Sequence, residues 1–204
     1  MTKFILARKG AMSRIFQADG TAVAVTKIMA EPCLITQIKT TETDGYQAVQ
    51  LASGTRRKTT KPLLGHSKAA GGAGFQFIKE FKVPASDYKV GQKIEVTAFQ
   101  PGDKVAATGW SKGRGFQGVV KRHHFHGHPT SHGHKDQARM PGSIGAGGVQ
   151  HVRKGMRMAG RMGNEQVTVH NLEVIKVDSQ NHELLLKGAV PGAYRGLILI
   201  KAQN

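Results

Sequence analysis

The segment 110–122 reads W-S-K-G-R-G-F-Q-G-V-V-K-R, so basic residues alternate with glycine around one phenylalanine, Phe116. Glycine lets the backbone approach a phosphate chain closely, and Arg and Lys supply charge and hydrogen-bond donors. The rings of Trp110, Phe116 and Phe125 are suited to stacking on unpaired bases. A glycine-rich surface loop with solvated charges has a similar composition. The absence of any acidic residue over 104–135 favours RNA contact instead.

Six histidines follow this segment, and clustered histidines can chelate zinc, nickel or copper. They are His123, His124, His126, His128, His132 and His134. Cys33 is the only cysteine and Asp136 the only nearby carboxylate, while structural metal sites made of loop histidines alone are uncommon. We interpret the histidines as donors and stacking groups along nucleic acid, and expect no metal or other cofactor. A metal-handling protein is the alternative.

The same residues argue against catalysis. A histidine base needs an oriented partner, and Asp136 is the only acid in the run. Ser143 lies in P-G-S-I-G and not in a nucleophile elbow, and the glycines at 142–148 and 155–163 match neither a phosphate-binding loop nor a dinucleotide fingerprint. We therefore expect no catalytic residues and no small-molecule substrate.

The positive charge is concentrated in one part of the chain. The 204 residues carry 30 Lys and Arg against 13 Asp and Glu, a net charge of +17. Residues 104–164 hold 11 of these basic residues, one acidic residue and 13 of the 26 glycines, whereas residues 165–204 are neutral. Such a segment cannot bury enough apolar surface to form a core. It predicts an extended basic arm over 111–164, with a polyanion as partner.

A membrane partner is not expected. No apolar stretch approaches the ~20 residues of a membrane span, and the run Phe4–Ala7 is too short for the core of a signal peptide. The arm has glycine where an amphipathic helix needs an apolar face. We expect a cytoplasmic protein.

Short strand candidates bounded by turn residues flank the arm and predict a mainly β protein. They are Thr21–Met29, Cys33–Lys39, Tyr46–Leu51, Lys93–Phe99, Val105–Trp110, Gln166–Val177, Glu183–Lys187 and Leu197–Lys201. The first two are expected to form a hairpin or to lie adjacent. The apolar phase slips between Val169 and Leu172, which predicts a β-bulge.

This number of short strands predicts a closed or nearly closed β-barrel built from residues 1–110 and 165–204. An insertion over about 54–82 carries Arg56-Arg57-Lys58. Within it a helix is expected over Lys61–Ala70, with Pro62 in its first turn and Gly71 after its end.

Longer motifs resemble one protein family. They are K-G-A-M-S-R-I-F at 9–16, T-K-P-L-L-G-H at 60–66, G-F-Q-G-V-V-K-R at 115–122, S-H-G at 131–133, P-G-S-I-G at 141–145, K-G-M-R-M-A-G-R-M-G-N-E-Q-V-T-V at 154–169 and L-L-L-K-G-A-V-P-G at 184–192. In this order, from about Phe4 to Lys201, the chain resembles the bacterial branch of the universal large-subunit ribosomal protein L3 family. One departure is Ala146, which stands where many relatives carry a methylated glutamine.

The resemblance implies a structural constituent of the large ribosomal subunit that binds large-subunit (23S-type) rRNA near its 3′ end and promotes early assembly. It implies a translation-factor-like β-barrel with a small helical insertion, and a long arm that extends towards the peptidyl transferase centre. The implied partners are this rRNA and neighbouring large-subunit proteins in the cytoplasmic ribosome, with no homo-oligomer. A free-standing nucleic-acid chaperone is the alternative, which predicts similar affinity for DNA and RNA.

The implied rRNA-binding residues all lie in the arm. They are Lys112, Arg114, Phe116, Lys121, Arg122, His123, Ser131, His132, Arg139, Pro141, Ser143, Lys154, Arg157, Met158, Arg161 and Asn164.

Overall fold

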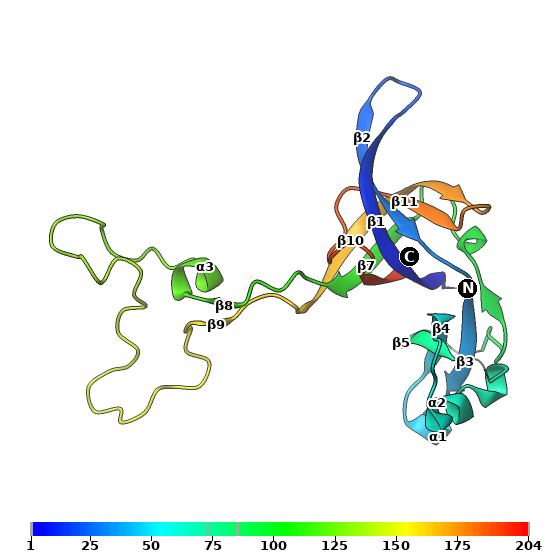
Figure 1. Cartoon of the computed structure of the whole chain (residues 1–204), viewed down its shortest axis with the longest axis horizontal. Helices are drawn as coiled ribbons and strands as arrows, with labels where there is room; N and C mark the ends of the chain where they lie inside the picture. The colour runs from blue at the N-terminus through cyan, green and yellow to red at the C-terminus, as the bar shows by residue number, and fades with distance from the viewer. Residues whose placement is uncertain (1, 73, 85, 204) are drawn as a thin grey trace. The chain divides into compact units, whose positions relative to one another are not determined.

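The computed structural model describes residues 2–72, 74–84 and 86–203. The chain divides into two compact units. We call residues 1–110 and 166–204 the barrel unit, and residues 111–165 the basic unit. Strands predominate and the helices are few and short, so the prediction of a mainly β protein is confirmed (Figure 1).

Six antiparallel strands of the barrel unit close into a barrel (Figure 1). Around it they follow the order β1 (Phe4–Phe16), β12 (Leu197–Ala202), β7 (Lys104–Trp110), β10 (Gln166–Asp178), β11 (Glu183–Lys187) and β2 (Ala22–Met29). Successive side chains of a strand point to opposite faces. In β12, Ile198 and Ile200 are accordingly buried, whereas Leu197 and Leu199 are half-buried.

Three register shifts bend the barrel strands, one of them between Val174 and Lys176 where β10 pairs with β11. The pairing of β10 with β7 shifts between Val169 and Leu172, where Asn171 takes a left-handed conformation with φ of 57°. The predicted bulge is therefore confirmed. The pairing of β1 with β2 shifts between Lys9 and Met12. An extra residue in one strand increases the local twist, which helps a small sheet to close.

A second sheet of four strands belongs to the same unit. Its order is β5 (Phe75–Phe81), β4 (Ala48–Thr55), β3 (Cys33–Lys39) and β6 (Lys93–Ile94). The connections contain α1 (Thr41–Asp44), α2 (Lys61–His66) and the short 3-10 helices η1 (Lys68–Ala70) and η2 (Val96–Ala98). The helix expected over Lys61–Ala70 is thus divided after His66.

Three expectations about these elements were wrong. β2 and β3 do not pair, because the Ala30 N–H after β2 donates to His182 O at 2.8 Å and β3 then joins the second sheet. The strand expected over Lys93–Phe99 ends at Ile94, since the next residues wind into η2. The small helical insertion expected over 54–82 is helical only over α2 and η1, because it also contributes the strand β5.

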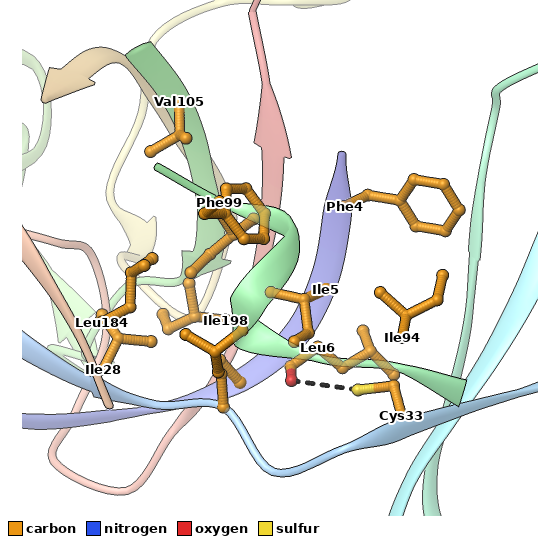
Figure 2. Packing of buried hydrophobic residues seen from close by; sticks show 14 of the residues in the cluster. Phe4, Ile5, Leu6, Ile28, Cys33, Ile94, Phe99, Val105, Leu184 and Ile198 are labelled. Atoms are coloured by element: carbon orange, nitrogen blue, oxygen red, sulfur yellow. Dashed lines mark hydrogen bonds between the residues drawn. The ribbon is translucent and has the colours of Figure 1, made fainter. Parts of the chain in front are cut away.

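A single hydrophobic core joins the barrel to the second sheet. Ile28 and Leu184 enter it from barrel strands, and Cys33 and Ile94 enter it from β3 and β6 (Figure 2). The Cys33 thiol donates to the carbonyl of Leu6 on β1 at 3.3 Å, which links the two sheets. Burial raises the pKa of this thiol to about 11.

A polar network holds α2 against the second sheet. The buried Gln50 on β4 accepts a hydrogen bond from Thr36 at 2.7 Å, and the His66 ring at the end of α2 lies 2.7 Å from the same oxygen. Gln50 also donates to Glu80 at 3.3 Å. Burial raises the pKa of Glu80, but hydrogen bonds from Tyr46 and other neighbours outweigh burial and hold it below its ordinary value.

Candidate nucleic-acid interface

The outgoing and returning segments of the basic unit pair with each other. β8 (Phe116–Gln117) and β9 (Gly160–Arg161) form the regular part of this pairing, in which Phe116 lies opposite Arg161 (Figure 1). The ladder continues where Arg114 N–H donates to Met162 O at 2.9 Å. It ends where Ser111 N–H donates to Glu165 O at 2.9 Å. We call this pairing of 111–117 with 160–165 the ribbon.

Two glycines of the ribbon lie close to neighbouring atoms. Gly163 has φ of 77°, and a Cβ there would lie 2.3 Å from Lys112 O. A Cβ on Gly160 would lie 2.6 Å from Nη1 of Arg122. The Gly163 contact is with main chain at a left-handed φ, so this position requires glycine, whereas a Cβ at Gly160 would displace the end of the Arg122 side chain.

The short helix α3 (Val119–His123) follows the ribbon and is tied to the returning chain. Arg122 Nη1 donates to the carbonyl of Met158 at 2.8 Å, and His123 Nε2 lies 3.1 Å from the same oxygen. Val119 is buried, and the helix ends at His124 in a left-handed conformation with φ of 61°. These contacts fix the helix across more than thirty residues of sequence.

Most of the sixteen residues implied as RNA contacts are exposed. The half-buried exceptions are Arg122, His123 and Met158, which the α3 tether brings together. Phe116 has 76% of its surface exposed, which is unusual for a large apolar ring. The other twelve residues of the set are all exposed. They are Lys112, Arg114, Lys121, Ser131, His132, Arg139, Pro141, Ser143, Lys154, Arg157, Arg161 and Asn164.

Some of these exposed residues lie close together and others do not. The ribbon places Phe116 opposite Arg161, and Pro141 and Arg157 line one hollow. The Ser143 hydroxyl donates to Gly145 O at 2.7 Å, within its own loop. Among the described residues, no hydrogen bond or ion pair joins Ser131, His132, Arg139 or Lys154 to another member of the set.

The charge of the basic unit is not neutralised within the protein. Residues 111–165 contain ten Lys and Arg, against Asp136 and Glu165. The ion pairs of the described residues all lie in the barrel unit, for example Lys3 with Asp103 at 2.6 Å. Ten cations without a carboxylate partner repel one another unless an anionic surface faces them.

The histidines do not assemble into a metal centre in the described part of the chain, where no group of three His, Cys, Asp or Glu side chains is placed to hold an ion. The rings of His128 and His134 stack instead, with centroids 5.4 Å apart and planes 10° apart. This shows that the imidazoles of this loop take part in stacking.

The insertion carries a further basic surface that lies outside the implied contacts. Arg56, Arg57, Lys58, Lys61 and Lys68 are all exposed. A signal for it is present in the sequence, because residues 45–79 contain no acidic residue. These cations are spread over a loop, α2 and η1.

The fold and the site define a β-barrel protein that carries a basic, acid-poor unit between β7 and β10, an arrangement typical of RNA-binding proteins. A model of the family described as ribosomal protein L3 matches residues 48–188. The chain belongs to the ribosomal protein L3 family, whose members are structural proteins of the ribosome and not enzymes. The expectation of no catalysis agrees with this membership.

Individual relatives match almost from end to end. The large ribosomal subunit protein uL3 of Herpetosiphon aurantiacus is 50% identical, with 98% of this chain and 96% of the relative covered. The proteins of the same name from Pelotomaculum thermopropionicum and Geobacter sulfurreducens are 48% and 46% identical, with 98% of this chain and 97% of each relative covered.

Among the described residues, no helix is long and apolar enough to cross a membrane.

Proposed function

We propose that this protein is a structural constituent of the large ribosomal subunit and binds large-subunit rRNA directly, chiefly through the basic unit. The main observation in support is the exposed charge of residues 111–165, which no ion pair among the described residues neutralises. The shared name of the relatives, large ribosomal subunit protein, supports the assignment to that subunit.

The proposal extends to the position and the timing of binding. The protein, whose barrel is similar to that of translation factors, binds near the 3′ end of the rRNA and promotes early subunit assembly beside neighbouring large-subunit proteins. The basic unit acts as an extended arm towards the peptidyl transferase centre. The family resemblance supports these details, and the narrow ribbon, in which Gly163 allows close approach of the two chains, fits a segment that passes between packed RNA helices.

The chemistry of binding follows from the exposed groups. Lys112, Arg114, Lys154 and Arg161 neutralise phosphates and release counterions, which makes affinity fall steeply with salt. Phe116 is exposed for stacking on an unpaired base. Specificity then comes from RNA shape and 2′-hydroxyl contacts more than from base edges, because the phosphate contacts carry no sequence information.

A salt titration tests this function. The full chain is bound to the 3′-terminal domain of large-subunit rRNA over a series of KCl concentrations. Arg114→Gln and Lys154→Gln should each lower the slope of log K against log salt by about 0.7 to 0.9, the contribution of one phosphate contact. Lys176→Gln is the matched control, because Lys176 is an exposed cation on β10 of the barrel unit.

Equal slopes for the two arm variants and the native chain would contradict the proposal. Equal affinity for duplex DNA and for the rRNA would favour the chaperone alternative. In cells, the protein should co-sediment with large subunits, and its recovery mainly in the ribosome-free pool would be incompatible with a structural role.

A further inference from the structure

The basic unit contains a hollow of about 490 Å³ beyond the end of α3. It is lined by residues 123–128, which include His123, Phe125 and His128 and which we call the ring wall, and by Met140 and Pro141 from a second segment. Arg157 borders the same space. Its volume lies within the roughly 300–1,000 Å³ of sites that hold small ligands, so it suits one nucleotide and not a duplex.

Main-chain and side-chain contacts fix the ring wall of this hollow. His123 lies 3.1 Å from the carbonyl of Met158, the neighbour of Arg157. At the far end, His128 N–H donates to Ala138 O at 3.1 Å, and the His128 ring stacks on His134. The hollow is therefore bounded by chain segments that are joined to each other on two sides.

The lining has the chemistry of a base-binding site. The rings of His123 and Phe125 lie 6.1 Å apart and, with the Pro141 ring and the Met140 thioether, offer flat or polarisable surfaces to a planar heterocycle. The ten described residues that line the hollow include no carboxylate. Arg157 supplies a planar cation suited to a phosphate oxygen.

We infer that this hollow binds the base of one unpaired rRNA nucleotide, held by the ring wall and the Met140–Pro141 segment with its phosphate at Arg157. The inference rests on the proposed function and adds a specific subsite to it. Charge attracts the rRNA to the whole basic unit, whereas this subsite distinguishes an unstacked base from a bare sugar-phosphate chain.

Two single-stranded probes of equal length and charge separate base binding from charge neutralisation. One is oligo(A) RNA and the other is the same oligomer with abasic riboses. Both are bound to the full chain without EDTA and again with EDTA, which removes metal ions that histidines would otherwise ligate. The native protein should bind oligo(A) more tightly than the abasic probe.

Phe125→Ala should weaken oligo(A) binding roughly 5- to 150-fold, the effect of losing one aromatic stacking contact, and leave the abasic probe and the salt slope unchanged. Phe125→Tyr should restore the native preference. Tyr194→Ala, which removes an aromatic side chain exposed to 61% in the barrel unit, is the matched control and should change neither probe. Arg157→Gln should weaken both probes and lower the slope by about 0.7.

Tryptophan fluorescence reports base binding at the subsite directly, so that an unfolded variant is not mistaken for a lost stacking contact. In Phe125→Trp, the emission of the new tryptophan should be quenched by oligo(A) and not by the abasic probe, with the native chain and its single Trp110 as background. Equal native affinity for the two probes, or a base preference that disappears in EDTA, would overturn the subsite. Failure of the proposed function is distinguishable, because the native chain would then bind neither probe nor the rRNA domain.

Discussion

Arg122 and His123 show how single residues of the basic unit combine folding with binding. The Arg122 guanidinium has five donors, and the bond to Met158 O engages Nη1. This bond holds the half-buried Arg122 side chain, and with it α3, to the returning chain, whereas the neighbouring Lys121 is exposed. Removal of Arg122 is therefore expected to disturb the geometry of the unit as well as its charge.

Cys33 gives a residue-scale prediction for the barrel unit. Burial raises the pKa of its thiol to about 11, and its hydrogen bond points at the main chain of β1. Because the thiolate is the reactive form, the native protein should react with a thiol reagent at pH 8 at least 100-fold more slowly than in denaturant, where the pKa returns to about 8.5. Time-resolved labelling measures both rates. Fast labelling of Cys33 in the native protein would show that the contact between β1 and β3 opens readily.

The ribbon is the element that positions the exposed cations, and it depends on Gly163. Replacement by Ala places a Cβ 2.3 Å from Lys112 O at a φ of 77°. The left-handed conformation alone costs about 1–2 kcal/mol for a residue with a side chain, so the ribbon should open at least 5- to 30-fold more often. Trypsin cleavage after Arg114 and Arg161, which lie in the ribbon, should accelerate by that factor, while the thermal midpoint of the barrel unit stays the same.

Gly147→Ala is the control for this variant, because a Cβ at Gly147 would meet no atom within 4 Å and its φ is not in the left-handed region. Its cleavage rate should equal that of the native chain. If trypsin cleaved the Gly163→Ala variant at the native rate, opening of the ribbon would not be the step that limits cleavage.

Elements with a local signal were predictable from the sequence, and elements defined by distant partners were not. Gly71 and Pro62 marked the helical stretch, and the slip between Val169 and Leu172 marked the bulge. The strand β1 was missed because Arg8, Lys9 and Gly10 interrupt its apolar pattern. Its first part, Phe4–Arg8, pairs with β12, nearly two hundred residues away, and the rest pairs with β2.

The candidate site likewise has features that were predictable from the sequence and features that were not. Its charge and glycine content were visible as composition, so the exposed cations of the basic unit were predictable. The tether of Arg122 to Met158 and the hollow lined by the ring wall and Pro141 were not, because each joins segments that are remote in sequence. Such contacts are set by main-chain carbonyls and loop conformations that residue type does not specify.

At the scale of the whole molecule, folding and RNA binding use different parts of the chain. Every residue of the hydrophobic core lies in the barrel unit, and the basic unit contributes only Val119 to the buried apolar residues of the described chain. The barrel unit thus has the apolar burial that stabilises a domain, and the basic unit has the uncompensated charge that stabilises a complex.

This separation predicts that the barrel unit folds without residues 111–165. Trp110 and Gln166 are register partners on β7 and β10, so an Asn-Gly turn can join them as a two-residue hairpin. The shortened chain should keep the core, with a free energy of unfolding within about 1 kcal/mol of the native value, because the deletion removes no residue of the hydrophobic core. Its rRNA affinity should fall and its salt dependence should shrink without vanishing, since the cations of the insertion remain. Thermal unfolding by circular dichroism and the same rRNA salt titration measure the two effects. An unfolded or aggregated product would show that the basic unit is needed to fold the barrel.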